Sequence, residues 1–229
     1  PSVKIIHSEI TSSQNVLKSS KEKVSTNKKS LKFLKHISIN KVDFSYSKEK
    51  KILDNIELLI NKNESIGIIG ESGSGKSTLI DLIMGLLNPN KGSISVDGIN
   101  IDKDYSQWHS IIGYVPQDIY LIEGTIAENI AFSRIDEPID YNLIKKICQI
   151  SCLDDYLKEL PKGLGTLVSS RNTKMSGGQR QRIGLARALY KKAQVFIFDE
   201  STSALDEKLT KNVLDNLKNY LKNKTVFFI

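Results

Sequence analysis

The residues with the clearest chemistry are nine in a row, Gly70 to Thr78, which read G-E-S-G-S-G-K-S-T. They fit the pattern G-x-x-x-x-G-K-[ST] at every fixed position. An apolar run over 65–70 precedes them and a helical run over 78–87 follows, which predicts a buried strand, a glycine loop and a helix N-terminus in succession. Backbone N–H groups in such a loop converge, and the helix start adds unpaired donors and partial positive charge. The stretch therefore predicts a phosphate-binding loop.

Each residue type in this loop suits a nucleotide. The Lys76 ammonium would bridge the β- and γ-phosphates, and the Ser77 hydroxyl would be a Mg²⁺ ligand. The loop residues predicted to contact the nucleotide are Gly70, Glu71, Ser72, Gly73, Ser74, Gly75, Lys76, Ser77 and Thr78. The alternative is a glycine-rich turn that binds nothing, and the Lys-Ser pair in its strand-to-helix context argues against it.

A second candidate is the pair of carboxylates that follows the apolar run 195–198. A buried strand should not end in adjacent acids without a reason, because burying charge is costly unless the charge is paired or metal-bound. Asp199 suits a Mg²⁺ contact, direct or through water, and Glu200 suits polarising an attacking water. A solvated strand end is the alternative, and the nearby phosphate loop argues against it.

Three further features are less specific. Tyr46 lies 24 residues before the loop and could stack on a nucleobase, although an exposed strand tyrosine is the usual reading. Gln117 ends an apolar strand that begins at Ile111. The segment Met175-Ser-Gly-Gly-Gln179 opens a helix over 179–190, so it is a second potential anion cradle.

The elements that must position these residues follow from periodicity. Strand patterns cover 37–46, 52–60 and 92–98, which could form an antiparallel sheet over the nucleotide-binding core. Residues 118–175 are predicted to be mostly helical, and 225–229 begins another buried strand. An amphipathic helix is predicted over 207–220.

Composition and charge exclude several classes of protein. The 229 residues are 39% hydrophobic and 26% charged, which is ordinary for a globular protein. No apolar run is long enough to span a bilayer, and no signal-peptide pattern opens the chain. Residues 1–51 hold 12 Lys against 4 acidic residues, whereas the remainder holds 21 basic and 22 acidic residues. A neutral core argues against nucleic-acid binding, while the basic lead-in fits either an anionic membrane surface or a solvated tail.

Taken together, residues 38–229 resemble the nucleotide-binding domain of an ABC transporter. The resemblance rests on motifs in a fixed order: the phosphate loop Gly70–Thr78, the Q-loop Gln117, the signature Met175–Gln179, the Walker B strand Val195–Glu200 and the D-loop Ser203–Asp206. Tyr46 falls at the family's adenine-stacking aromatic, and the stretch Glu123–Ile130 resembles the exporter subgroup. The resemblance implies a P-loop NTPase of the α/β class: a RecA-like parallel sheet core, an N-terminal antiparallel β-subdomain, and a helical subdomain inserted at about 118–178.

The resemblance also implies a mechanism. ATP and Mg²⁺ would be the cofactors, with Glu200, Lys76 and Gln117 catalytic and Ser77, Gln117 and Asp199 near the metal. Two copies would sandwich two ATP molecules head to tail, so that each ATP meets the signature and D-loop of the partner. The residues involved are Met175, Ser176, Gly177, Gly178 and Gln179, and Ser203, Ala204, Leu205 and Asp206. Coupling helices of a membrane domain would dock near 123–130, at the cytoplasmic face of a bacterial membrane.

The sequence departs from the family pattern at three places. Met175 replaces a leucine of similar volume, and Ser170 stands where a glutamate is common. The family's switch histidine follows the strand matched by 226–229, so we expect a longer parent chain and weak or no ATP turnover without the missing residues. Residues 1–37 are expected to be a linker from a membrane domain, and Pro1-Ser-Val-Lys-Ile-Ile resembles the end of the last span in lipid-linked oligosaccharide flippases.

Two other functions stay open at this point. One is a non-transport ABC ATPase of DNA repair or translation, which a coiled-coil insertion or a second cassette would favour. The other is a module that binds ATP without efficient hydrolysis, which the missing histidine would favour.

Overall fold

The computed structural model describes residues 31–47, 50–132, 138–169, 175–199 and 207–229, except the side chains of the first two residues of the last range. The chain divides into two units, Pro1–Ser30 and Leu31–Ile229, and every described element belongs to the second. Leu31 and Phe33, which precede the predicted domain start at 38, are buried in the core of this unit. The assignment of the preceding residues as a linker stays a prediction.

An antiparallel sheet with strand order β2-β1-β4-β5 forms the first layer. Its strands are β1 (His36–Phe44), β2 (Leu53–Asn61), β4 (Lys91–Val96) and β5 (Ile99–Asn100). In the register, Ile37 of β1 lies between Ile60 and Val96, and all three side chains are buried. The predicted strands over 37–46, 52–60 and 92–98 are thus confirmed.

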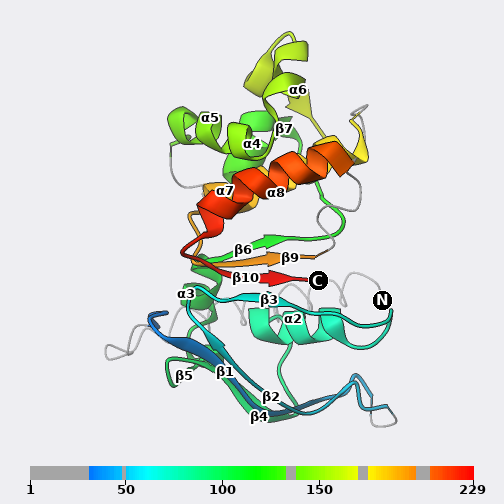
Figure 1. The fold of residues 1–229 in the computed structure, drawn as a ribbon, viewed down its shortest axis with the longest axis vertical. Coiled ribbons are helices and arrows are strands. Elements are labelled where there is room, and N and C mark those ends of the chain that lie inside the picture. Colours follow the sequence, from blue (N-terminus) through cyan, green and yellow to red (C-terminus); the bar gives the residue numbers. More distant parts are fainter. Residues whose placement is uncertain (1–30, 48–49, 133–137, 170–174, 200–206) are drawn as a thin grey trace, which may run out of the picture. The chain divides into compact units, whose positions relative to one another are not determined.

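A parallel sheet with order β3-β10-β9-β6 forms the centre of the fold. Its strands are β3 (Ser65–Gly67), β6 (Ile112–Val115), β9 (Val195–Phe198) and β10 (Thr225–Phe228). Side chains alternate between its faces: Val195 and Ile197 pack on one core cluster, whereas Phe196 and Phe198 pack on the other. In Figure 1 the sheet lies between α2 (Lys76–Met84) and α8 (Glu207–Leu221), whose apolar residues belong to these two clusters.

The prediction of a buried strand before the phosphate loop is wrong in one respect. β3 is the edge strand of the described sheet, so its residues are exposed or half-buried, and the side chain of Ile69 is 98% exposed. An edge strand has one free side, and an apolar run in a sequence does not reveal sheet order.

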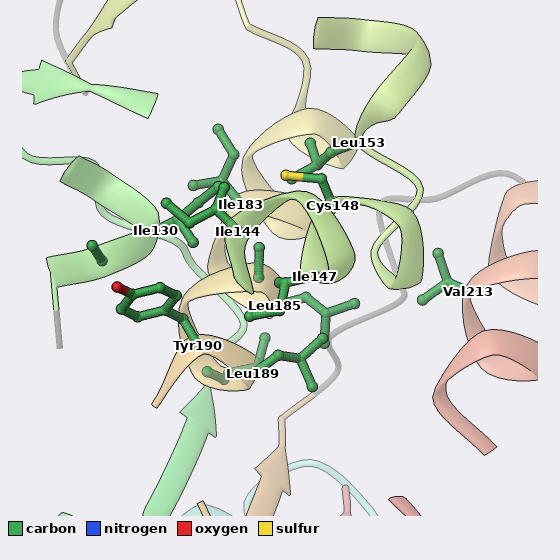
Figure 2. Close-up of a cluster of buried hydrophobic side chains, with 14 of the residues drawn as sticks. Ile130, Ile144, Ile147, Cys148, Leu153, Ile183, Leu185, Leu189, Tyr190 and Val213 are labelled. Atoms are coloured by element: carbon green, nitrogen blue, oxygen red, sulfur yellow. The ribbon is translucent and has the colours of Figure 1, made fainter. Parts of the chain in front are cut away.

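The segment between β6 and β9 is mostly helical, as expected. Its helices are α4 (Ile126–Ala131), α5 (Tyr141–Ile150), α6 (Asp154–Glu159) and α7 (Gly177–Tyr190). Figure 2 shows their shared core, where Ile144 and Ile147 of α5 meet Ile183 and Leu189 of α7. Two short strands, β7 (Gly124–Thr125) and β8 (Leu167–Val168), pair in this region and were not predicted, since two residues carry no periodicity. The remaining elements are α3 (Tyr105–Ser110) and the 3-10 turns η1 (Ile101–Lys103) and η3 (Gly163–Gly165).

The parallel core, the antiparallel β-subdomain and the inserted helices confirm the predicted fold class. The core also explains how α2 is placed. Its apolar residues fill the space between the two sheets, and Trp108 of α3, which is fully buried, donates a hydrogen bond to the carbonyl of Ile83 at 2.8 Å. The helix ends at Met84 because Gly85 adopts φ 74°, a left-handed conformation that favours glycine.

Asp97 ties the start of the unit to the β4–β5 turn, and this generates a prediction. Its carboxylate accepts hydrogen bonds from the backbone N–H groups of Leu34, Lys35 and His36. Partial burial opposes ionisation, yet these three donors hold the pKa of Asp97 below its ordinary value of 3.8. Asp97→Asn should therefore lower the free energy of unfolding at pH 7 by roughly 1–2 kcal/mol, at or below the lower end of the range for hydrogen bonds to charged groups because solvent screens this site.

The pH dependence checks this assignment. A group with a lowered folded-state pKa contributes stability above its unfolded pKa and loses it as the pH falls through the folded value. Urea unfolding at pH 7 and at acid pH should thus show the difference between wild type and Asp97→Asn shrinking on acidification. Asp102→Asn, at an exposed position on η1, is the control. A constant difference across pH would show that charge is not the cause.

Candidate nucleotide site

One cavity gathers most of the residues that were predicted to contact a nucleotide. It has a volume of about 740 Å³. Its lining consists of Tyr46, Ile52, Ile68, Ile69, Gly70, Ser72, Gly73, Gly75, Lys76, Ser77, Thr78, Gln117, Asp199 and Ile229. Residues far apart in the sequence meet here because the carboxyl ends of parallel strands lie at one edge of the sheet.

The junction between the loop and α2 depends on glycine. Gly75 is the N-cap of α2 with φ 96°, and Gly73 has φ 80°, both in the left-handed region. A Cβ on Gly75 would lie 3.1 Å from Ile52 Cγ2 and 3.2 Å from Leu53 Cδ2. No side chain of the described chain caps this helix, so the N–H groups of its first turn stay directed at the cavity.

The side chain of Lys76 folds back onto the phosphate loop and bonds to its backbone. Its Nζ donates to the carbonyl of Gly70 at 2.8 Å and to that of Glu71 at 2.9 Å. The backbone N–H of Ser74 also donates to the Glu71 carbonyl, at 3.2 Å. Lys76 is half-buried and lines the cavity, and carbonyl oxygens are weaker acceptors than phosphate oxygens, so the same group can turn to an anion there.

Tyr46 lies at the mouth of the cavity. Its hydroxyl is 3.2 Å from Thr78 Oγ1, and its ring packs edge-on against Phe44 with centroids 4.9 Å apart. The side chain is 65% exposed, which leaves a ring face open for stacking. The position of the ring beside the start of α2 agrees with the predicted contact with adenine, which stays a prediction.

Asp199 follows β9 directly and carries a negative charge on the wall of the cavity. The Tyr114 hydroxyl donates to Asp199 Oδ2 at 3.3 Å. Burial and then the charge of Asp199 raise the pKa of Tyr114 to about 12. Burial and the same charge also raise the pKa of Asp81 on α2. A Mg²⁺ ion bound near Ser77 and Asp199 would offset this repulsion, so the residues present fit the predicted cation.

Asp81 and Tyr114 are absent from the residues predicted above, yet Tyr114 donates to Asp199 and the charge of Asp199 raises the pKa of Asp81. A signal for Asp81 exists in the sequence: it lies four residues after Ser77, so both share one face of a helix. A signal for Tyr114 is weaker, because its contact needs β6 and β9 to be neighbours, which the sequence does not reveal. Four isoleucines of the lining, Ile52, Ile68, Ile69 and Ile229, were not predicted either.

The signature segment does not line this cavity. Ser176 caps α7, where its Oγ accepts from the Gln179 N–H at 3.1 Å and its own N–H donates to Gln179 Oε1 at 2.8 Å. Met175 is buried in the core of the helical region, which agrees with its apolar replacement of leucine. Residues of the phosphate loop line the cavity, whereas none of the signature residues Met175–Gln179 of the same chain does.

Several predicted residues lie outside the described part of the chain. They are Glu200, Ser170, and the D-loop residues Ser203, Ala204, Leu205 and Asp206. Gln117 lies within the described part of the chain, where it is exposed and lines the same cavity as Asp199. Among the described helices, none has both the length and the apolar character needed to cross a membrane.

Comparisons with known proteins agree with this site. A family model described as ABC transporter matches residues 53–203. The chain is 35% identical over 198 residues to the lactococcin-G-processing and transport ATP-binding protein LagD of Lactococcus lactis, covering 86% of this chain and 28% of that protein. It is 35% identical over 192 residues to an ATP-dependent lipid A-core flippase of Cupriavidus pinatubonensis, covering 82% of this chain and 32% of that protein.

A solved structure shows the same fold. The structure of a bacterial Atm1-family ABC exporter with ATP bound aligns with a TM-score of 0.83 at 29% identity, covering 90% of this chain and 36% of that one. The chain thus spans about a third or less of the length of each of these relatives.

The glycine at the helix start generates a second prediction. Gly75→Ala adds backbone strain and a contact with Ile52, so it should displace the loop and abolish Mg²⁺-ATP binding in calorimetry. Gly98→Ala is the matched control, because Gly98 has φ 79° but no atom within 4 Å of the added Cβ. Both variants should melt at lower temperature, and only the first should lose nucleotide. Equal ATP affinity in both would refute the role of Gly75.

Proposed function

Since the chain belongs to the ABC transporter family, we propose that it is the ATP-binding and ATP-hydrolysing motor domain of an exporter. The cavity that joins Tyr46, the phosphate loop, Gln117 and Asp199 is the observation that carries this proposal. The exporter would move or flip its substrate across a bacterial membrane, with this domain at the cytoplasmic face. The transport name of LagD and the exporter name of the Atm1-family structure support this direction.

In the proposed site the phosphates lie over the loop and the first turn of α2. The backbone N–H groups and Lys76 neutralise their charge, and Mg²⁺ is held near Ser77, Gln117 and Asp199. Adenine stacks on Tyr46. Glu200, which follows Asp199, polarises the attacking water.

A second copy of the chain completes the site. One phosphate loop would leave the γ-phosphate open on one side, and the capped start of α7 does not line the cavity of its own chain. A partner's Ser176–Gln179 segment would close that side with a further helix N-terminus. ATP then holds two copies together, and hydrolysis releases them.

Calorimetry with this chain tests nucleotide binding. Mg²⁺-ATP should bind, and Lys76→Ala should weaken its affinity by roughly 30-fold or more, the loss of a charge-assisted hydrogen bond worth about 2 kcal/mol. Lys103→Ala, an exposed lysine on η1, should leave the affinity unchanged. If the chain shows no Mg²⁺-dependent affinity for ATP, the proposal fails.

Mixing two inactive variants tests the second copy. In the full exporter, Lys76→Ala removes the phosphate loop's cation and Ser176→Phe blocks the signature, so each variant alone should lack ATP turnover. A mixed assembly holds one site with an intact loop from one copy and an intact signature from the other. Turnover should therefore reappear on mixing. No recovery, although mixed assemblies are isolated by two affinity tags, would contradict a site shared between copies.

A further inference from the structure

The backbone that carries Tyr46 begins where the antiparallel sheet ends. Strand β1 ends at Phe44, and its pairing with β2 reaches no further along the chain. The next backbone N–H, that of Ser45, donates to a side chain instead of a strand: Asn90 Oδ1 accepts it at 2.6 Å. Tyr46 is the following residue, so this acceptor fixes the backbone directly before the ring.

Asn90 is itself held by the start of β4. Its own backbone N–H donates to the carbonyl of Asp43 at 2.9 Å, so its backbone and its side chain bond to residues on either side of Phe44. Lys91, the next residue, lies opposite Asp43 in the β1–β4 register. The Asn90 side chain therefore continues the contact between β1 and β4 beyond the last paired strand residue.

The carboxylate of Asp43 ties the same strand end to β2. Its Oδ1 accepts from Lys51 Nζ at 2.9 Å and from the backbone N–H of Asn55 at 2.8 Å. The end of β1 is thus fixed from both neighbouring strands, and Asn90 supplies the contact at the residue adjacent to Tyr46.

Tyr46 itself borders two hollows. One is the nucleotide cavity, and the other is a polar pocket with a volume of about 480 Å³. This second pocket is lined by Asp43, Ser45, Tyr46, Ser47, Lys51, Asn90 and Lys91. Because most of the Tyr46 side chain is open to solvent, packing fixes its orientation only in part. The position of its backbone therefore decides where the ring face points.

We propose that Asn90 is a positioning residue for the nucleobase: its side chain holds the Ser45 N–H and thereby keeps the ring of Tyr46 in the orientation that stacks on adenine. This inference rests on the proposed function and adds a residue that lies outside its motifs. The hydrogen bonds of Asn90 named above run to the end of β1 and not to the phosphate loop. Its loss should therefore weaken the contact with the base and spare the contacts with the triphosphate.

Calorimetry of the full chain with two ligands separates these contacts, because Mg²⁺-ATP presents a base and Mg²⁺-tripolyphosphate does not. Asn90→Ala should lower the ratio of the ATP affinity to the tripolyphosphate affinity by roughly 2- to 10-fold, the loss of one hydrogen bond, with the tripolyphosphate affinity unchanged. Asn90→Asp keeps an oxygen acceptor and should keep the wild-type ratio. Asn88→Ala is the matched control in the same loop, where the Asn88 side chain accepts from the Tyr105 hydroxyl at 2.5 Å, and it should also keep the ratio.

A double-mutant cycle tests whether Asn90 acts through Tyr46. Tyr46→Ala removes the stacking ring and should lower the ratio by itself. Adding Asn90→Ala to that variant should then lower the ratio no further. A further fall would show that Asn90 affects the base by another route, and it would overturn the inference.

The outcomes separate this inference from the proposed function. An unchanged ratio in Asn90→Ala would overturn the inference alone, whether both affinities persist or both fall together. A wild-type ratio in Tyr46→Ala would overturn it as well, because no stacking ring would then need to be positioned. Absence of Mg²⁺-ATP binding by the wild type would instead overturn the proposed function, and this inference with it.

Discussion

The negative charge of a triphosphate must be neutralised by a few groups that are fixed in place. The phosphate loop and the elements that hold it are arranged to satisfy this requirement. Here the groups are one ammonium and the N–H donors of a loop and a helix start, which can converge only if the backbone turns through left-handed φ values. Gly75 supplies that turn and also the capless start of α2. Its neighbours Ile52 and Leu53 belong to the region where the antiparallel sheet begins its second strand, so the packing of that sheet holds the loop in position.

Asp199 adds a carboxylate to the lining of the same cavity. After burial, its charge raises the pKa of Asp81 on α2, and the hydroxyl of Tyr114 donates to Asp199. Such a wall is costly without a cation and favourable with one, since a divalent ion lowers the energy of both charges at once. A magnesium nucleotide carries its cation on its phosphates, so the predicted Mg²⁺-ATP would suit both the phosphate loop and Asp199, which line the same cavity.

The sequence predicts the parts of this site that are local and fails where the geometry is long-range. The loop, the helix after it and the strand before Asp199 each follow from a contiguous pattern of residues. The exposure of β3 could not be predicted, because it depends on this strand being at the edge of the described sheet. The pairing of β7 with β8 could not be predicted either, since Gly124 and Val168 meet only after the helices between them have packed. The contact between Tyr114 and Asp199 could not be predicted for the same reason, because it requires β6 and β9 to be neighbours.

Helix α7 is too short to bend and too well packed to slide independently of the helices around it. α7 has 14 residues, which at 1.5 Å per residue gives roughly 20 Å between its signature end and its cationic end. Its buried face is fixed by the core shared with α4 and α5, and Arg187 ties its last turn to the chain around Asn129. A displacement at one end must therefore move the whole helix or disrupt that core. Because disrupting a packed core costs several kcal/mol, rigid movement of α7 is the cheaper response to a displacement of either of its ends. The last turn that carries Arg187 would then move with the Ser176 end.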